Sequence, residues 1–158
     1  MSKKQIWVMV IAAAILIYSF VKYSQELSNA WSEVCFQSRC VQVEVAQKKE
    51  DLLRGLQDRT SLPEKGGMLF IFPKPGEYHM WMKDTRIPLD IIWLDHYQNV
   101  IFIAKNLQPC QKDPCPSYGP RQEALYVLEV NAGLADKWQL KLNDWANFKI
   151  KEPGKEES

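Results

Sequence analysis

The sequence predicts a mainly β fold, an antiparallel sandwich or a partly open barrel with two short helices, preceded by one N-terminal transmembrane helix. Three observations lead to this prediction. Short runs of apolar and β-branched residues recur between turn signals over residues 41–150. Only two short segments in that range have a helical pattern. Ahead of them, one uncharged apolar run of 16 residues begins at Ile6.

Composition favours one ordered domain and gives no sign of a nucleic-acid partner. The 158 residues are 46% hydrophobic and 25% charged, with 20 Lys and Arg against 19 Asp and Glu. Lys3, Lys4 and Lys22 flank the apolar run, which leaves 20 − 3 = 17 basic residues to face all 19 acids. A chain without a basic excess lacks the positive field that a phosphate backbone requires, so we expect no binding to nucleic acid.

The apolar N-terminal run predicts a single membrane anchor over residues 5–23, with residues 1–4 in the cytoplasm and membrane lipid as its partner. Its 16 residues span about 24 Å as a helix, and Lys4 and Lys22 can extend to the two interfaces of a core about 30 Å thick. The basic residues favour an inside N-terminus and an extracytoplasmic domain. A cleaved signal peptide is the main alternative, although the small-residue triplet Ser28–Ala30 lies far beyond the apolar run. A buried core helix is the third.

Four cysteines occur as two pairs with the same spacing, Cys35 with Cys40 and Cys110 with Cys115. An even number in regular pairs fits an oxidising compartment and supports export. Two local disulfides would each stabilise the fold by about 2 kcal/mol, and crossed pairing between the segments by about 4.5 kcal/mol. A four-thiolate zinc site and a redox-active dithiol are further interpretations, disfavoured by the oxidising setting and by the spacing respectively.

Between the anchor and the domain, residues 24–40 are expected to form a juxtamembrane stalk. Leu27, Ala30, Trp31 and Val34 recur at helical spacing, with Trp31 at the membrane interface, against the domain or in a self-association seam. The globular domain is predicted over residues 41–150 and a disordered tail over 151–158. The expected strands are 41–45, 68–72, 77–83, 89–94, 100–104, 125–130 and 145–150, with helical segments at 48–54 and 132–138.

The stretch Glu77–Asp95 is the most informative part of the sequence. Its first half alternates two faces, with Tyr78, Met80 and Met82 toward the core and Glu77, His79, Trp81 and Lys83 away from it. Its second half, residues 89–94, is predicted to be a core strand. The loop at 106–120 holds four prolines and two cysteines, and a loop of this length is usually functional or needs a covalent staple.

An acid, an imidazole, an indole and an amine on one strand face are typical of a site that stacks a sugar or another flat polar ligand. The predicted ligand-binding residues are Arg59, Trp81, Lys83, Asp90 and Tyr118, with the loop between Cys110 and Cys115 as the rim. A solvated strand face is the alternative. Asp90 is expected either to pair with Arg59, Lys83 or Arg86 or to contact the ligand. With only two histidines we expect no His-rich metal site, and neither a metal nor a cofactor.

Four motifs carry a resemblance to a known family. They are Arg54–Pro63, Gly67–Phe72, Trp81–Ile92 and Cys115–Pro120, and together they resemble the successive signatures of the domain of unknown function 192 family over about Val41 to Ile150. The resemblance implies a small, mainly β prokaryotic domain, often behind a secretion signal or anchor, with no known activity. It also implies that Cys110 pairs with Cys115, the two cysteines inside the matching region. Gln57 and Asp84 stand where the family tends to have Met and Asn.

Three function classes remain open at this point. The leading hypothesis is a membrane-anchored extracytoplasmic binding module for a polar ligand such as a glycan. The second is a structural or interaction protein that docks another membrane protein through a sheet edge or Trp31. An enzyme is least favoured, because no nucleophile, base and orienting partner can be assembled from these residues.

Overall fold

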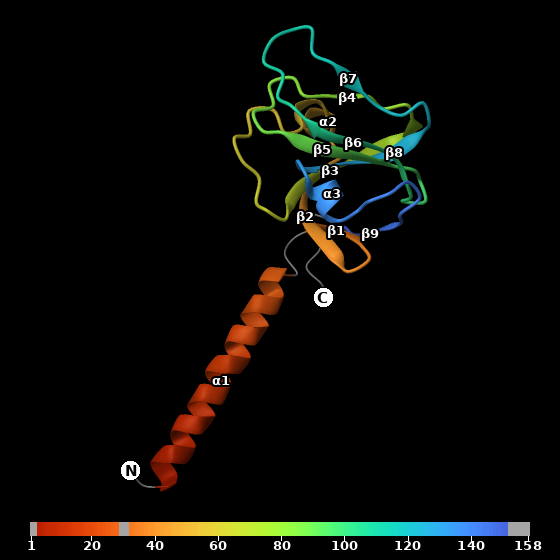
Figure 1. Cartoon of the computed structure of the whole chain (residues 1–158). Helices are drawn as coiled ribbons and strands as arrows, with labels where there is room; N and C mark the ends of the chain where they lie inside the picture. The colour runs from red at the N-terminus through yellow and green to blue at the C-terminus, as the bar shows by residue number, and fades with distance from the viewer. Residues whose placement is uncertain (1–2, 29–31, 152–158) are drawn as a thin grey trace. The chain divides into compact units, whose positions relative to one another are not determined.

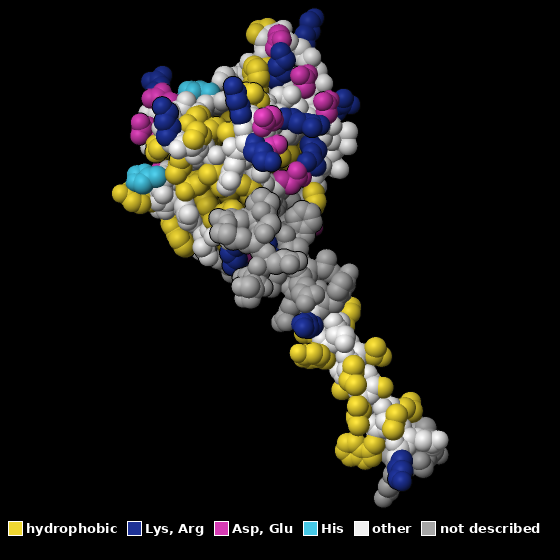
Figure 2. Space-filling view, turned by 180° about the vertical axis from the view of Figure 1, so that it is seen from behind, with side chains coloured by type: hydrophobic (Ala, Val, Ile, Leu, Met, Phe, Trp, Pro, Cys, Tyr) yellow, Lys and Arg dark blue, Asp and Glu magenta, His cyan; other side chains and the backbone are white. Residues whose placement is uncertain are grey.

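The computed structural model describes residues 3–28 and 32–151, which belong to two separate compact units. The first unit contains α1 (Lys3–Ser28), a continuous helix. Its segment Lys4–Lys22 has a mean hydropathy of 1.9, and none of it is buried inside the structure. Apolar side chains cover its surface in Figure 2. This helix is long and apolar enough to cross a membrane, which is compatible with an anchor or with a signal sequence.

The second unit is built on one seven-stranded sheet with the strand order β6-β5-β8-β3-β2-β1-β9 (Figure 1). Neighbouring strands are antiparallel except for the parallel pair β2 and β3. A separate ribbon pairs β4 with β7. The elements are β1 (Ser32–Phe36), β2 (Arg39–Ala46), α2 (Lys49–Arg54), β3 (Gly66–Gly76), β4 (Met80–Trp81), β5 (Leu89–Leu94), β6 (Val100–Leu107), β7 (Ser117–Tyr118), β8 (Ala124–Asn131), α3 (Leu134–Lys137) and β9 (Ala146–Lys149).

The sheet curls so that its two edge strands meet at one end. Asn99, just before β6, forms a bridge with Trp145, just before β9. The backbone N–H of Val100 donates to the carbonyl of Asp144 at 2.9 Å, and that of Ala146 donates to the carbonyl of Gln98 at 2.9 Å. The result is a curled half-barrel, which confirms the expected mainly β, partly open barrel.

The two faces of the sheet bury separate apolar clusters. Leu134 and Ala135 of α3 pack with Leu128 and Val130 of β8 on one face. On the other face, Leu56 after α2 and Met82 after β4 pack with Ile91 and Trp93 of β5, and α2, β4 and β7 lie together on that side in Figure 1. Because β5 is buried on both faces, all six of its residues are apolar or, in the case of Asp90, internally hydrogen-bonded.

The alternation in Glu77–Lys83 is confirmed by exposure. The side chains of Glu77, His79 and Trp81 are exposed, whereas Met82 is buried. The turn after β5 is also as expected, because the Asp95 carboxylate accepts hydrogen bonds from the backbone N–H groups of Tyr97 and Asn99. α2 ends where predicted, at Gly55, whose positive φ of 50° favours glycine.

The expected stalk over residues 24–40 is wrong for its C-terminal part, which belongs to the sheet. The helix continues to Ser28, but Ser32–Phe36 forms strand β1 and pairs with both β2 and β9. Val34 and Phe36 bury their side chains in the sheet, so their spacing of two reports a strand and not a helical stripe. The sheet therefore begins at Ser32 and not at residue 41. Trp31 and the tail 152–158 lie outside the described residues.

Both cysteine pairs form local disulfides, and none of the four cysteines is free. Cys35 and Cys40 face each other across the β1–β2 hairpin with a Cα–Cα distance of 4.0 Å. Cys110 and Cys115 close the loop after β6 with a Cα–Cα distance of 5.8 Å. These bonds confirm the local pairing and exclude crossed pairing and a four-thiolate zinc site in this state.

Candidate functional site

A narrow crevice opens on the face of the sheet that α2 covers. Its volume is about 30 Å³, room for roughly one water-sized group. The turn that follows α2 forms one wall, and β4 with the residues after it forms the other. The lining residues are Leu52, Leu53, Arg54, Gly55, Leu56, Gln57, Phe70, Met80, Trp81, Lys83, Thr85 and Glu129.

Glu129 lies among these lining residues, on β8. Its neighbours across the sheet are Met68 on β3 and Ile91 on β5, both members of the apolar cluster on this face. The side chain is only 4% exposed, and within residues 3–28 and 32–151 its carboxyl makes no hydrogen bond or ion pair. Burial raises the pKa of Glu129 from 4.5 to about 8. At neutral pH the crevice therefore contains a protonated carboxyl that can donate a hydrogen bond.

Trp81 and Lys83 stand at the mouth of this crevice. The pairing of β4 with β7 positions Trp81, whose side chain is 51% exposed. The ammonium of Lys83 lies 5.6 Å from the centroid of that indole, and 2.7 Å from Oδ2 of Asp113. The hydrogen bond and the charge of Asp113 raise the pKa of Lys83. The mouth thus combines an accessible aromatic plate with a permanent cation.

The disulfide loop forms the rim beside these two residues. The backbone N–H of Cys110 donates to the carbonyl of Met82 at 3.0 Å, and that of Asp84 donates to the carbonyl of Cys110 at 3.0 Å. The side-chain amide of Gln111 donates to the carbonyl of Thr85 at 2.7 Å. The loop therefore holds the backbone on both sides of Lys83, and it also supplies the partner acid Asp113.

A larger cleft of about 390 Å³ lies on the other side of the turn after α2. Its lining residues are Glu44, Val45, Ala46, Asp51, Arg54, Gly55, Arg59 and Met68. Arg59 forms an ion pair with Glu44 across this cleft, and both side chains are about half exposed. Arg54 and Gly55 line both the cleft and the crevice.

The structure gathers three of the five predicted ligand-binding residues around these two hollows. Trp81 and Lys83 line the crevice, and Arg59 lines the cleft. Tyr118 is half-buried on β7, where it pairs with Met80 and packs on the core. The predicted role of these residues in binding stays a prediction.

Asp90 is placed on the opposite face of β5 and cannot reach Trp81. It is fully buried, its Oδ1 accepts from the backbone N–H of Asn106 at 2.8 Å, and its Oδ2 accepts from that of Ala135 at 2.8 Å. It does not pair with Arg59, Lys83 or Arg86, which bind Glu44, Asp113 and Asp58. Asp90 ties β6 and the start of α3 to the sheet, which is a structural role.

Sequence reasoning missed Glu129, although the signal was present. Glu129 stands between Leu128 and Val130 in a predicted strand, and a period of two places it on the same face as buried Val127. A single acid in an apolar strand is the same anomaly that drew attention to Asp90. The local sequence pattern does not show on which of the two sheet faces a crevice would form.

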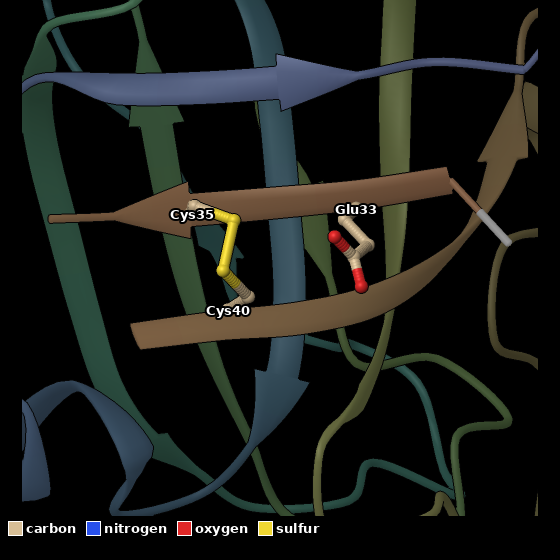
Figure 3. A group of neighbouring side chains, drawn as sticks. All are labelled: Glu33, Cys35 and Cys40. Atoms are coloured by element: carbon tan, nitrogen blue, oxygen red, sulfur yellow. A yellow bond between two sulfur atoms is a disulfide. The ribbon is translucent and has the colours of Figure 1, made fainter. Parts of the chain in front are cut away.

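One group of potential metal ligands in the described residues does not form a metal site in this state. Glu33, Cys35 and Cys40 place ligand atoms within 4.8 Å of one another. Figure 3 shows that the two sulfurs are joined in the disulfide, whereas metal binding requires free thiolates. The Glu33 carboxylate is also engaged by Lys149 on β9 at 3.5 Å.

Comparison with known proteins places the domain among uncharacterised ones. The family described as DUF192, "Uncharacterized ACR", matches residues 33–148. A solved structure from Novosphingobium aromaticivorans DSM 12444, of unknown function, is 31% identical with a TM-score of 0.67 over 74% of this chain and 83% of its own. A protein from Sinorhizobium meliloti 1021, provisionally named a transcription regulator, is 27% identical with a TM-score of 0.67 over 74% of this chain and 91% of its own. No curated protein matches.

Proposed function

The chain belongs to the DUF192 family, whose function is unknown, and we propose that this member is a binding module for a polar extracytoplasmic ligand, of the glycan class. The observation that carries the proposal is that Glu129, a buried residue, lines a crevice whose mouth presents Trp81, while its carboxyl makes no hydrogen bond or ion pair in the described part of the chain. Compared with the site expected from the sequence, the proposed binding site retains Trp81 and Lys83, adds Glu129 and omits Asp90.

Burial of Glu129 in this position lowers the free energy of unfolding at neutral pH. A pKa raised from 4.5 to about 8 means that folding at pH 7 includes an unfavourable proton uptake of roughly 3 kcal/mol. A domain is stable by only about 5–15 kcal/mol, so this is a large penalty. The surrounding cluster of Met68, Phe70 and Ile91 would accept an apolar side chain without it. Such a penalty is typical of a functional position.

The chemistry of the site selects a ligand with a flat face and hydroxyl or carbonyl oxygens. A sugar ring can stack on the half-exposed indole of Trp81. One small polar group of that ligand fits the crevice, where the protonated carboxyl of Glu129 donates a hydrogen bond to it. Lys83 supplies a second donor at the mouth, and its ion pair with Asp113 holds it over the ring.

The proposal also includes a cellular location for the domain. The apolar helix α1 acts as a single-pass anchor in membrane lipid with the N-terminus inside, so the disulfide-bonded domain faces the oxidising side. We do not extend the provisional name of the Sinorhizobium protein to this chain. Beyond Lys22 it carries fewer basic than acidic residues, and charges of both signs are interspersed in Figure 2.

A saccharide panel tested on the full chain in detergent can decide this proposal. We expect at least one member to raise the melting temperature, Trp81→Ala to weaken its binding about tenfold or more, and Glu129→Ala to do the same. Trp145→Ala is the matched control, because Trp145 is 57% exposed but lines neither the crevice nor the cleft. Absence of any shift, or equal binding by the Trp81 and Trp145 variants, would refute the proposal.

A further inference from the structure

We propose that the crevice and the larger cleft form one continuous groove that binds an acidic oligosaccharide of at least two residues, with Arg54 at the junction binding its carboxylate. This inference rests on the proposed function and specifies the ligand class. It assigns roles to Arg54, Asp51 and Gly55, which sequence reasoning had not connected with binding.

Two observations join the hollows. Arg54 and Gly55 line both of them, so they adjoin at this turn. Their floors are also neighbours, because Met68 of the cleft and Glu129 of the crevice are Cα partners on adjacent antiparallel strands. Residues paired in this way lie about 5 Å apart. A ligand that reaches Glu129 can therefore continue over Arg54 and Gly55 into the cleft.

The sizes of the two hollows set the length of the ligand. The crevice, at about 30 Å³, admits one small group and no ring. The cleft, at about 390 Å³, is within the size range of sites for small molecules. One sugar ring can occupy the cleft while another stacks on Trp81 at the mouth of the crevice. A single ring can contact only one of these two surfaces, so we expect a monosaccharide to bind more weakly than a disaccharide.

One cation along the groove is available to an acidic ligand. Arg59 is paired with Glu44, and Lys83 is paired with Asp113. Arg54 is exposed and has no ion pair within the described part of the chain. A guanidinium can bind a carboxylate through two parallel hydrogen bonds. The remaining acid of the cleft, Asp51, is also unpaired there and can accept hydrogen bonds from ligand hydroxyls.

Titration calorimetry on the full chain in detergent tests the inference with galacturonic acid, its dimer and its trimer, and the matching neutral galactose oligomers. We expect the acidic dimer to bind about tenfold or more tightly than the acidic monomer and than the neutral dimer. Arg54→Gln should remove the preference for acid and retain the preference for length. Arg121→Gln is the control, because Arg121 is exposed and lines neither hollow.

Failure of the inference is distinguishable from failure of the proposed function. Equal affinity for monomer and dimer, or for acidic and neutral dimers, would overturn the continuous acidic groove while binding through Trp81 persisted. Loss of the acid preference in Arg121→Gln, or its persistence in Arg54→Gln, would also overturn the role of Arg54. If no saccharide binds the wild type, or Trp81→Ala binds as well as the wild type, both proposals fall together.

Discussion

Asp90 and Glu129 are two buried acids on adjacent strands, with opposite environments. Asp90 on β5 pairs with Val130 on β8, and the next residue, Ile91, pairs with Glu129. The carboxylate of Asp90 accepts two backbone N–H groups at 2.8 Å on the α3 side of the sheet. The carboxyl of Glu129 has no hydrogen-bond partner in the described residues and faces the crevice on the α2 side.

The contrast separates an acid that maintains the fold from one that is available for binding. Asp90 accepts from the partly buried backbone N–H of Asn106 and from the buried backbone N–H of Ala135, and both would otherwise lose this acceptor. Glu129 is bonded to no other group within residues 3–28 and 32–151, and burial raises its pKa to about 8. Replacing the Asp90 carboxylate should therefore lower the stability of the fold, whereas replacing the Glu129 carboxyl with an uncharged amide should raise it at neutral pH.

Asp90→Ala should produce the largest effect. It leaves the buried N–H of Ala135 and the partly buried N–H of Asn106 without this acceptor, and we expect the free energy of unfolding to fall by about 3–5 kcal/mol. Urea denaturation of the full chain in detergent measures this. Asp90→Asn keeps one acceptor oxygen and should lose less. A loss below about 1 kcal/mol for the alanine variant would show that Asp90 is not the structural member of the pair.

Glu129→Gln should sharpen the contrast through pH. The folded protein binds a proton at Glu129 between about pH 4.5 and pH 8 that the unfolded chain releases, so wild-type stability falls as pH rises through this window. Between about pH 5.5 and pH 7.5 the loss due to Glu129 should be roughly 2–3 kcal/mol. Glu129→Gln should lack this component, and the difference between the two unfolding profiles isolates it. Parallel profiles would contradict a raised pKa.

The Cys110–Cys115 disulfide lies at the rim of the crevice that contains Glu129, and its removal should affect both stability and binding. The double variant Cys110→Ser, Cys115→Ser should lower the free energy of unfolding by about 2 kcal/mol, because it frees a short loop in the unfolded chain. It should also weaken ligand binding, since the loop positions Lys83 and Asp113. The matching double variant at Cys35 and Cys40 should lose similar stability with unchanged affinity. Equal effects of both double variants on affinity would remove the loop from the site.

Asp113 extends the comparison to an exposed acid and should have the smallest effect on stability. Its ion pair with Lys83 is solvent-accessible, with side chains 63% and 34% exposed, so Asp113→Asn should leave the free energy of unfolding close to that of the wild type. It should lower the pKa of Lys83, because Asp113 is the main cause of the raised value. A Lys83 ammonium titration by NMR measures this shift, and an unchanged pKa would contradict the pairing.

Local pattern predicted most strands but not their partners. The alternation of Val41–Val45 and the apolar run Leu89–Leu94 identified β2 and β5, because one buries a single face and the other both. β1 was missed because Val34 also fitted a helical stripe that began at Leu27. The parallel pairing of β2 with β3 had no local signal, since it depends on a connection through α2 and the loop that follows.

The same reasoning explains the uneven prediction of the site. Trp81 and Lys83 were found because they alternate with half-buried Met80 and buried Met82 within one segment. Glu129 is more than forty residues further along the chain, and its proximity to them depends on the order β5-β8-β3 in the sheet. Asp90 was included because it is the one acid within the apolar run Leu89–Leu94, whereas only its bonds to β6 and α3 show that its carboxylate is already occupied.

The most direct test of the central claim is the pKa of Glu129, measured from the carboxyl carbon by NMR titration of the full chain in detergent. The resonance can be assigned by its absence in Glu129→Gln. A midpoint near 8 is expected if the carboxyl is buried without a partner and protonated at neutral pH in the crevice. A midpoint near the ordinary value of 4.5 would contradict this, because Glu129 would then be a solvated or paired carboxylate and could not donate a hydrogen bond to a ligand.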